Sequence, residues 1–158
     1  MQHYPSIYLE DGKNSEAFYC LRPPKIAIVF VHGFTGVALK TWNNFADLVQ
    51  DDPQFSESDI FFYGYESLKG QIFDQSMDFL SFLNKQLSKI STFRTTMSSD
   101  LYQKIIVVAH SQGAIVARYA LLPCCTSRPS NCWALLRPLL IRSPGQRKHS
   151  SANYPIAF

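Results

Sequence analysis

The residue of this sequence best placed to do chemistry is Ser111, which lies between a short apolar run and a helix-forming stretch. Ala109 and Gly113 flank it, and a sharp turn needs small residues there because larger side chains would collide with the neighbouring strand or helix. This spacing matches the G-x-S-x-G nucleophile elbow, with alanine in place of the first glycine. An elbow raises the serine Oγ at the end of a strand and aims the backbone N–H of Gln112 at a developing oxyanion. An ordinary strand-to-helix turn with a surface serine is the alternative.

A second stretch, KIAIVFVHGFTG at residues 25–36, favours the elbow. It predicts a buried β-branched strand that ends in His32-Gly33-Phe34. With this pair of motifs the chain resembles the α/β-hydrolase superfamily, in particular the lipase-like serine esterases. In that family a strand ending in His-Gly precedes the elbow strand, and the residue after the glycine lends its N–H to the oxyanion hole. The resemblance implies that the oxyanion donors are the backbone N–H groups of Phe34 and Gln112.

The resemblance also implies an activity: cleavage of carboxylic esters through an acyl-enzyme on Ser111, without a cofactor. Small-molecule or lipid esters are the substrates that it implies. His32 is better interpreted as a residue that organises its loop than as the catalytic base. His110 is adjacent to Ser111, so its side chain should point away from the serine Oγ. The catalytic acid and base are therefore not identified in this chain.

The elements that must position these motifs alternate along the chain. Apolar runs predict buried strands at 25–31, 59–67 and 105–108, and the Asp11-Gly12 pair predicts an N-terminal hairpin. Between the strands, Thr41 is expected to cap a helix that carries Trp42, Phe45, Leu48 and Val49 on one face. A second helix should begin near residue 72, and a third should follow Ser111 and stop at Pro123. This order predicts a doubly wound, mostly parallel sheet of the α/β-hydrolase type, with its later strands missing.

Several other classes of protein are not indicated. The sequence HGFTGVA does not supply the G-x-G-x-x-G of dinucleotide-binding proteins, and no P-loop is present. A net charge of +3 gives no strong case for nucleic acid. The spacing of Cys124, Cys125 and Cys132 matches no zinc pattern, so no metal site is predicted. Without an 18-residue apolar run or a secretory signal, we expect a cytoplasmic protein with no transmembrane segment.

The composition changes sharply after Ser111. Six basic residues and no Asp or Glu follow it, and the only later histidine is His149. In the α/β-hydrolase family the triad acid and base come after the nucleophile. We therefore expect residues 1–122 to be the N-terminal part of a hydrolase domain, and residues 123–158 to be an atypical basic tail, either non-native or disordered.

One account of this break is a larger hydrolase whose chain ends early, after a shift of reading frame. The sheet edge beside the elbow strand would then be open to self-association. The alternative function is a catalytically inactive remnant or binding module that keeps the elbow and lacks the triad acid and base. Labelling with a fluorophosphonate distinguishes the two, because only an activated serine reacts quickly at neutral pH.

Overall fold

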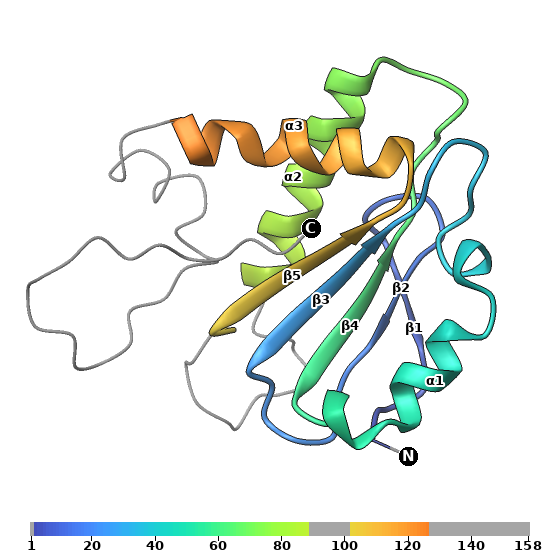
Figure 1. The fold of residues 1–158 in the computed structure, drawn as a ribbon, viewed down its shortest axis with the longest axis vertical. Helices are drawn as coiled ribbons and strands as arrows, with labels where there is room; N and C mark the ends of the chain where they lie inside the picture. The colour runs from blue at the N-terminus through green and yellow to red at the C-terminus, as the bar shows by residue number, and fades with distance from the viewer. Residues whose placement is uncertain (1, 89–101, 127–158) are drawn as a thin grey trace, which may run out of the picture.

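The chain forms one five-stranded sheet with helices packed on it, in a computed structural model that describes residues 2–88 and 102–126 (Figure 1). The strands are β1 (Ile7–Leu9), β2 (Ser15–Phe18), β3 (Ile26–Val31), β4 (Ser58–Tyr63) and β5 (Lys104–Ala109). The α-helices of the described residues are α1 (Phe45–Asp51), α2 (Ile72–Ser88) and α3 (Gln112–Thr126), with single 3₁₀ turns at Lys40–Trp42 and Pro53–Phe55. The prediction of an atypical basic tail lies outside the described residues from residue 127 onward.

The sheet is mixed, with the strand order β1-β2-β4-β3-β5. Strand β3, the middle one of the three parallel strands, pairs with β4 on one side and with β5 on the other, and Ile28 lies opposite both Ile60 and Ile106. The N-terminal hairpin, predicted from Asp11-Gly12, is present as β1 and β2, and β2 pairs antiparallel with β4. The α/β class is confirmed, whereas the prediction of a mostly parallel sheet is confirmed only for β3, β4 and β5.

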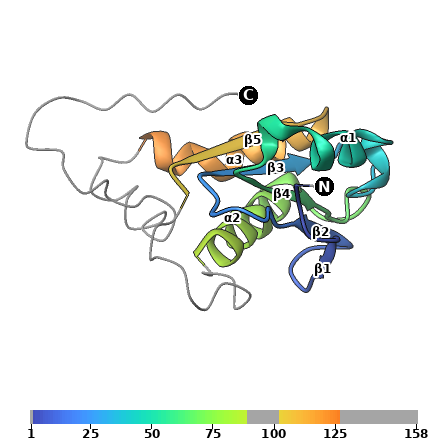
Figure 2. The same cartoon turned by 90° about the horizontal axis from the view of Figure 1, so that it is seen from below.

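Helices cover both faces of this sheet, because the strand side chains are apolar on both sides. On one face, Val29 and Phe61 pack with Phe79 and Leu83 of α2 and with Val116 of α3. On the other face a second cluster joins the sheet to α1; its buried members include Ile28, Phe30, Ala46, Val49, Ile60 and Phe62. Figure 2 shows α1 and α2 on opposite sides of the strands. Among the residues described, no helix combines the length and the apolar content needed to cross a bilayer.

Three predicted boundaries are wrong. Thr41 does not cap a helix, because its hydroxyl hydrogen-bonds to the backbone of Val37 at 2.7 and 2.9 Å, and α1 begins later, at Phe45. The predicted apolar face of this helix is wrong at Leu48, which is exposed, whereas Ala46 and Val49 are buried. The strand predicted for 59–67 ends at Tyr63.

The third wrong boundary is the stop at Pro123. The helix α3 continues to Thr126. A proline removes one backbone donor, and this loss does not end the helix here. The predicted domain boundary after residue 122 stays a prediction, and α3 extends four residues beyond it.

Gly64, directly after β4, fixes the hairpin turn against the sheet. The Lys13 N–H donates to the Gly64 carbonyl at 2.7 Å, and the Gly64 N–H donates to the buried Ser15 hydroxyl at 2.9 Å. A Cβ atom at Gly64 would lie 1.8 Å from the Lys13 carbonyl oxygen. No side chain fits at this position, so the hairpin and the end of β4 approach each other at backbone distance.

Gly64→Ala should therefore lower the free energy of unfolding by at least about 1–3 kcal/mol, the cost of overpacking a tight contact. Gly70→Ala is the matched control, because a Cβ there meets no atom within 4 Å and bears only the strain of φ +90°. Its expected cost is smaller, about 1–2 kcal/mol. Urea denaturation of the two variants measures both costs, and an equal or smaller loss for Gly64→Ala would contradict the close approach.

Candidate active site

Ser111 lies at the apex of the turn between β5 and α3, as the elbow pattern predicts. Its φ is +53°, in the left-handed region that non-glycine residues rarely adopt, and it is exposed. The turn is closed by hydrogen bonds from the Gly113 N–H to the His110 carbonyl (2.9 Å) and from the Ala114 N–H to the Ser111 carbonyl (3.0 Å). Strained backbone of this kind costs about 1–3 kcal/mol and persists only where the surrounding structure enforces it.

Gly113 is where the surrounding structure enforces the turn. A Cβ atom there would lie 2.3 Å from the His32 carbonyl oxygen and 2.6 Å from that of Val31. The first turn of α3 thus lies directly on the end of β3. On the other side, the His110 N–H donates to the Val31 carbonyl at 3.0 Å. The end of β3 therefore holds the chain both before and after Ser111.

The loop that follows β3 lies against the elbow. A Cβ atom on Gly33 would lie 2.8 Å from the Cβ of Ser111 and 2.9 Å from Nδ1 of His110. The loop then turns back, with the Gly36 N–H donating to the Gly33 carbonyl at 3.0 Å. Gly33 and Ser111, predicted from separate motifs, are thus brought together.

The expected oxyanion donors belong to this same pair of segments. Gln112 is the first residue of α3, where helix geometry leaves an N–H without an intrahelical acceptor. Phe34 follows Gly33, and its side chain is 59% exposed. Within residues 2–88 and 102–126, the backbone N–H groups of Phe34 and Gln112 make no hydrogen bond. Neither group therefore has a competing acceptor in this part of the chain, and their role as oxyanion donors stays a prediction.

His32 is buried beneath the loop and engages both of its ring nitrogens. Nε2 accepts from the Tyr65 N–H at 3.2 Å, which leaves the proton on Nδ1, 2.8 Å from the Gly33 carbonyl oxygen. The ring stacks on Tyr65 at 4.4 Å between centroids, and the Tyr65 hydroxyl donates to the His32 carbonyl at 3.0 Å. His32 therefore joins the end of β3 to the segment after β4 and has no free nitrogen to act on Ser111.

Burial determines the protonation of this pair. Desolvation lowers the pKa of His32, while its hydrogen bonds to Gly33 and Tyr65 act in the opposite direction and are weaker. Burial raises the pKa of Tyr65 to about 12, so its hydroxyl keeps the proton that it donates. A neutral His32 is required for the contact to the Tyr65 N–H.

A glutamine clamp that the sequence analysis missed connects the elbow to α2. Gln112 Nε2 donates to Gln75 Oε1 at 3.3 Å, and Gln75 Nε2 donates to the carbonyls of Glu66 and Lys69 at 3.0 Å each. Gln75 is buried on the face of α2 that carries Phe79 and Leu83. A glutamine within an apolar helical stripe was the signal that could have found it.

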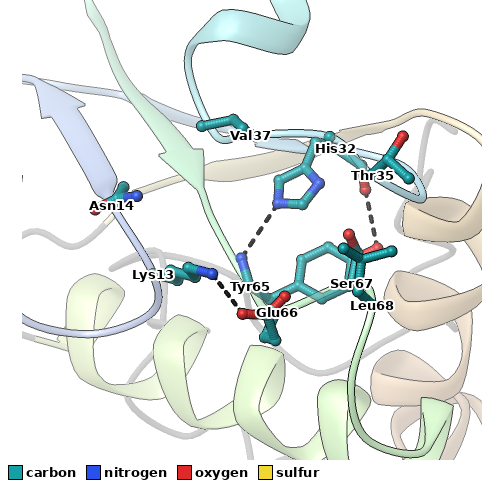
Figure 3. A pocket seen from close by; sticks show the side chains of 10 residues that line it. Lys13, Asn14, His32, Thr35, Val37, Tyr65, Glu66, Ser67 and Leu68 are labelled. Atoms are coloured by element: carbon teal, nitrogen blue, oxygen red, sulfur yellow. Dashed lines mark hydrogen bonds and ion pairs between the residues drawn. The ribbon is translucent and has the colours of Figure 1, made fainter.

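A pocket with a volume of about 160 Å³ lies beside the β3 loop (Figure 3). Three segments form its walls: the hairpin turn, the loop after β3 and the segment after β4. Its lining residues are Lys13, Asn14, His32, Thr35, Gly36, Val37, Tyr65, Glu66, Ser67 and Leu68. The ion pair between Lys13 and Glu66 crosses one wall. None of these residues except His32 was singled out from the sequence as part of a site.

Among the described residues, Ser111 has no hydrogen-bonded catalytic base. Neither a histidine nor a carboxylate there hydrogen-bonds to Ser111 Oγ. His110 is exposed and makes no side-chain hydrogen bond in the same part of the chain. What the geometry does supply is an exposed, strained serine beside two free backbone donors.

The sequence of the chain matches a known protein family. Residues 24–135 match the family described as "Putative serine esterase (DUF676)", and this range covers β3, the elbow and α3. Because the match spans more than half of the chain, the chain belongs to this family. No curated protein and no solved structure matches significantly.

The contact at Gly113 predicts a large cost for any added side chain. Gly113→Ala should lower the free energy of unfolding by about 1–3 kcal/mol or more, because the carbonyls of β3 are backbone atoms and cannot rotate away. Ala109→Gly is the control: it restores the first glycine of the motif and should cost only about 0.5–1 kcal/mol. Thermal or urea unfolding gives both values. A Gly113→Ala protein as stable as the parent would mean an open turn.

The lowered pKa of His32 predicts a titration below the ordinary histidine value of about 6.5. As the pH falls, the unfolded chain therefore binds a proton at this histidine before the folded chain does. Neutral His32 supports the folded state above about pH 6.5, and this contribution to the free energy of unfolding is lost as the pH falls below that value. NMR titration of the imidazole resonances measures the pKa directly. Urea unfolding at pH 7.5 and 5.5 tests the consequence for stability. A His32 pKa at or above 6.5 would contradict the neutral, buried ring.

Proposed function

We propose that this chain is a serine esterase of the α/β-hydrolase type, with a doubly wound sheet, that cleaves carboxylic esters through an acyl-enzyme on Ser111. One observation carries the proposal: an exposed serine at φ +53° between a parallel strand and a helix whose second residue, Gly113, admits no side chain. Membership of the serine esterase family supports it independently.

In the proposed reaction, Ser111 Oγ attacks the ester carbonyl carbon and its proton passes to a general base. The carbonyl oxygen gains negative charge, for which the N–H groups of Phe34 and Gln112 are the proposed donors. One such donor is worth about 3–4 kcal/mol of transition-state stabilisation. The tetrahedral intermediate collapses, the alcohol leaves with a proton, and an acyl ester remains on the serine. Water then attacks that ester and releases the acid.

The other site residues have structural roles in this proposal. Ala109 and Gly113 leave room for the sharp turn, Gly33 leaves room beside Ser111, and His32 organises the loop that carries Phe34. The clamp from Gln75 to Gln112 holds the first residue of α3 against α2. No metal or cofactor takes part in the proposed reaction.

A second candidate function is a binding module that keeps the elbow without catalysis. The observation that favours it is the lack, in residues 2–88 and 102–126, of any hydrogen bond to Ser111 Oγ. A serine without a base is a weak nucleophile. The proposed location is the cytoplasm and the proposed substrates are small-molecule or lipid esters, with the lipase subclass kept as a prediction.

The experiment that separates the two functions is labelling of the full chain with a fluorophosphonate at neutral pH. The esterase should be labelled within minutes, and mass spectrometry should locate the label on Ser111. Ser111→Gly, which removes the hydroxyl and suits the positive φ, should abolish both labelling and hydrolysis of p-nitrophenyl esters. Ser56→Ala, at the opposite end of the sheet, should react as the parent does. A folded parent that resists the reagent would support the binding module instead.

A further inference from the structure

The pocket beside His32 opens at the same edge of the sheet as Ser111. Strands β4, β3 and β5 are parallel neighbours, so the segments that follow them lie side by side at their carboxyl ends. The pocket occupies the space after β4 and β3, and Ser111 follows β5. Two strand spacings of about 4.8 Å separate the chain after β4 from the elbow. The pocket and Ser111 are therefore about 10 Å apart along this edge of the sheet.

Ser67 is the residue that points to a ligand in this pocket. It is only 6% exposed and lines the pocket. Its hydroxyl makes no hydrogen bond within the described part of the chain. Its oxygen is not one of the fully buried side-chain atoms that lack a partner, so it faces the space of the pocket. A ligand group in the pocket can donate to this hydroxyl or accept from it.

The charges around the pocket select a neutral ligand group. Lys13 and Glu66 pair with each other across the wall, so their charges offset each other beside the pocket. Asn14 and Thr35 also line the pocket with polar side chains (Figure 3). Amides and hydroxyls both donate and accept hydrogen bonds, and a ligand hydroxyl does the same.

The volume and the backbone fit the same ligand. About 160 Å³ accommodates a group of several heavy atoms, well beyond the space that one water needs. Asn14 (φ +56°) and Thr35 (φ +58°) both hold left-handed conformations at the rim. Such conformations are held in place by their surroundings, which leaves the rim preformed.

We propose that this pocket binds a short, neutral, hydroxylated part of the ester substrate, with the Ser67 hydroxyl as its main hydrogen-bond partner. The proposal rests on the esterase function assigned to Ser111 and adds the substrate class: esters whose alcohol or acyl part carries two or more hydroxyl groups near the scissile bond. The ligand crosses the loop at Gly33–Gly36 to place its carbonyl at Ser111.

Binding of uncleavable analogues to the full chain tests this without requiring turnover. For the alcohol side, propyl 2,3-dihydroxypropyl ether is compared with dipropyl ether. For the acyl side, N-propyl-3,4-dihydroxybutanamide is compared with N-propylbutanamide. Amide chemical shifts of ¹⁵N-labelled protein give the Kd and the location. In one of the two pairs, the hydroxylated member should bind about twofold to tenfold tighter, the range that one hydrogen bond gives, with shifts at residues 13–14, 35–37 and 65–68.

Two variants and one control make the assignment specific. Ser67→Ala should remove the preference for the hydroxylated member, and Asn14→Gly, which suits the positive φ, should weaken it. Ser56→Ala makes the same chemical change as Ser67→Ala at the opposite end of the sheet and should keep the preference. Equal Kd values within both pairs, shifts located elsewhere, or a preference that survives in Ser67→Ala would overturn the proposal.

Fluorophosphonate labelling separates this test from the esterase function. Labelling of Ser111 without any hydroxyl preference would leave the esterase standing and remove the pocket from substrate recognition. A hydroxyl preference that Ser67→Ala removes, in a chain that resists the reagent, would support the pocket as a binding site and count against the esterase.

Discussion

Because Gly113 has no side chain, the start of α3 can approach the end of β3 closely. With the His32 carbonyl oxygen 2.3 Å from the place of a Cβ, the helix begins directly on the backbone of the neighbouring strand. The His110 N–H is held by the Val31 carbonyl of that same strand. Ser111 lies between two points fixed to β3, and its left-handed backbone follows from that constraint. The strain at the serine is therefore enforced by strand–helix packing.

The loop after β3 extends this constraint from the elbow to the pocket. One of its sides touches Ser111 at Gly33, and its other side lines the pocket at Thr35 and Gly36. His32 fixes the loop from below through Tyr65, so the strands β3 and β4 share one hydrogen-bonded junction. The proposed reactive site and the proposed binding pocket therefore share one short segment.

The sequence predicted those features that depend on local pattern. The apolar, β-branched run Ile105–Val108 predicted a buried strand, and β5 spans that run. Its burial was overestimated, because β5 lies at the edge of the described sheet and only Val107 in it is buried. Gly113 and Ala109 marked the elbow because a sharp turn restricts side-chain size locally. The contacts that fix the site were not predictable in this way. His32 meets Tyr65 and Gln75 meets Gln112 across more than thirty residues, and such pairs depend on how the elements pack. The antiparallel attachment of β2 to β4 was missed for the same reason, since Asp11-Gly12 predicts a hairpin but not its neighbour.

The crystal structure of the chain after reaction with a fluorophosphonate tests the central claim most directly. The account predicts a phosphorus atom bonded to Ser111 Oγ, with its non-bridging oxygen about 2.7–3.1 Å from the N–H groups of Phe34 and Gln112. The left-handed φ of Ser111 and the contact between Gly113 and the end of β3 should be unchanged. A label on any other residue, no adduct at all, or a phosphoryl oxygen directed away from both N–H groups would contradict it.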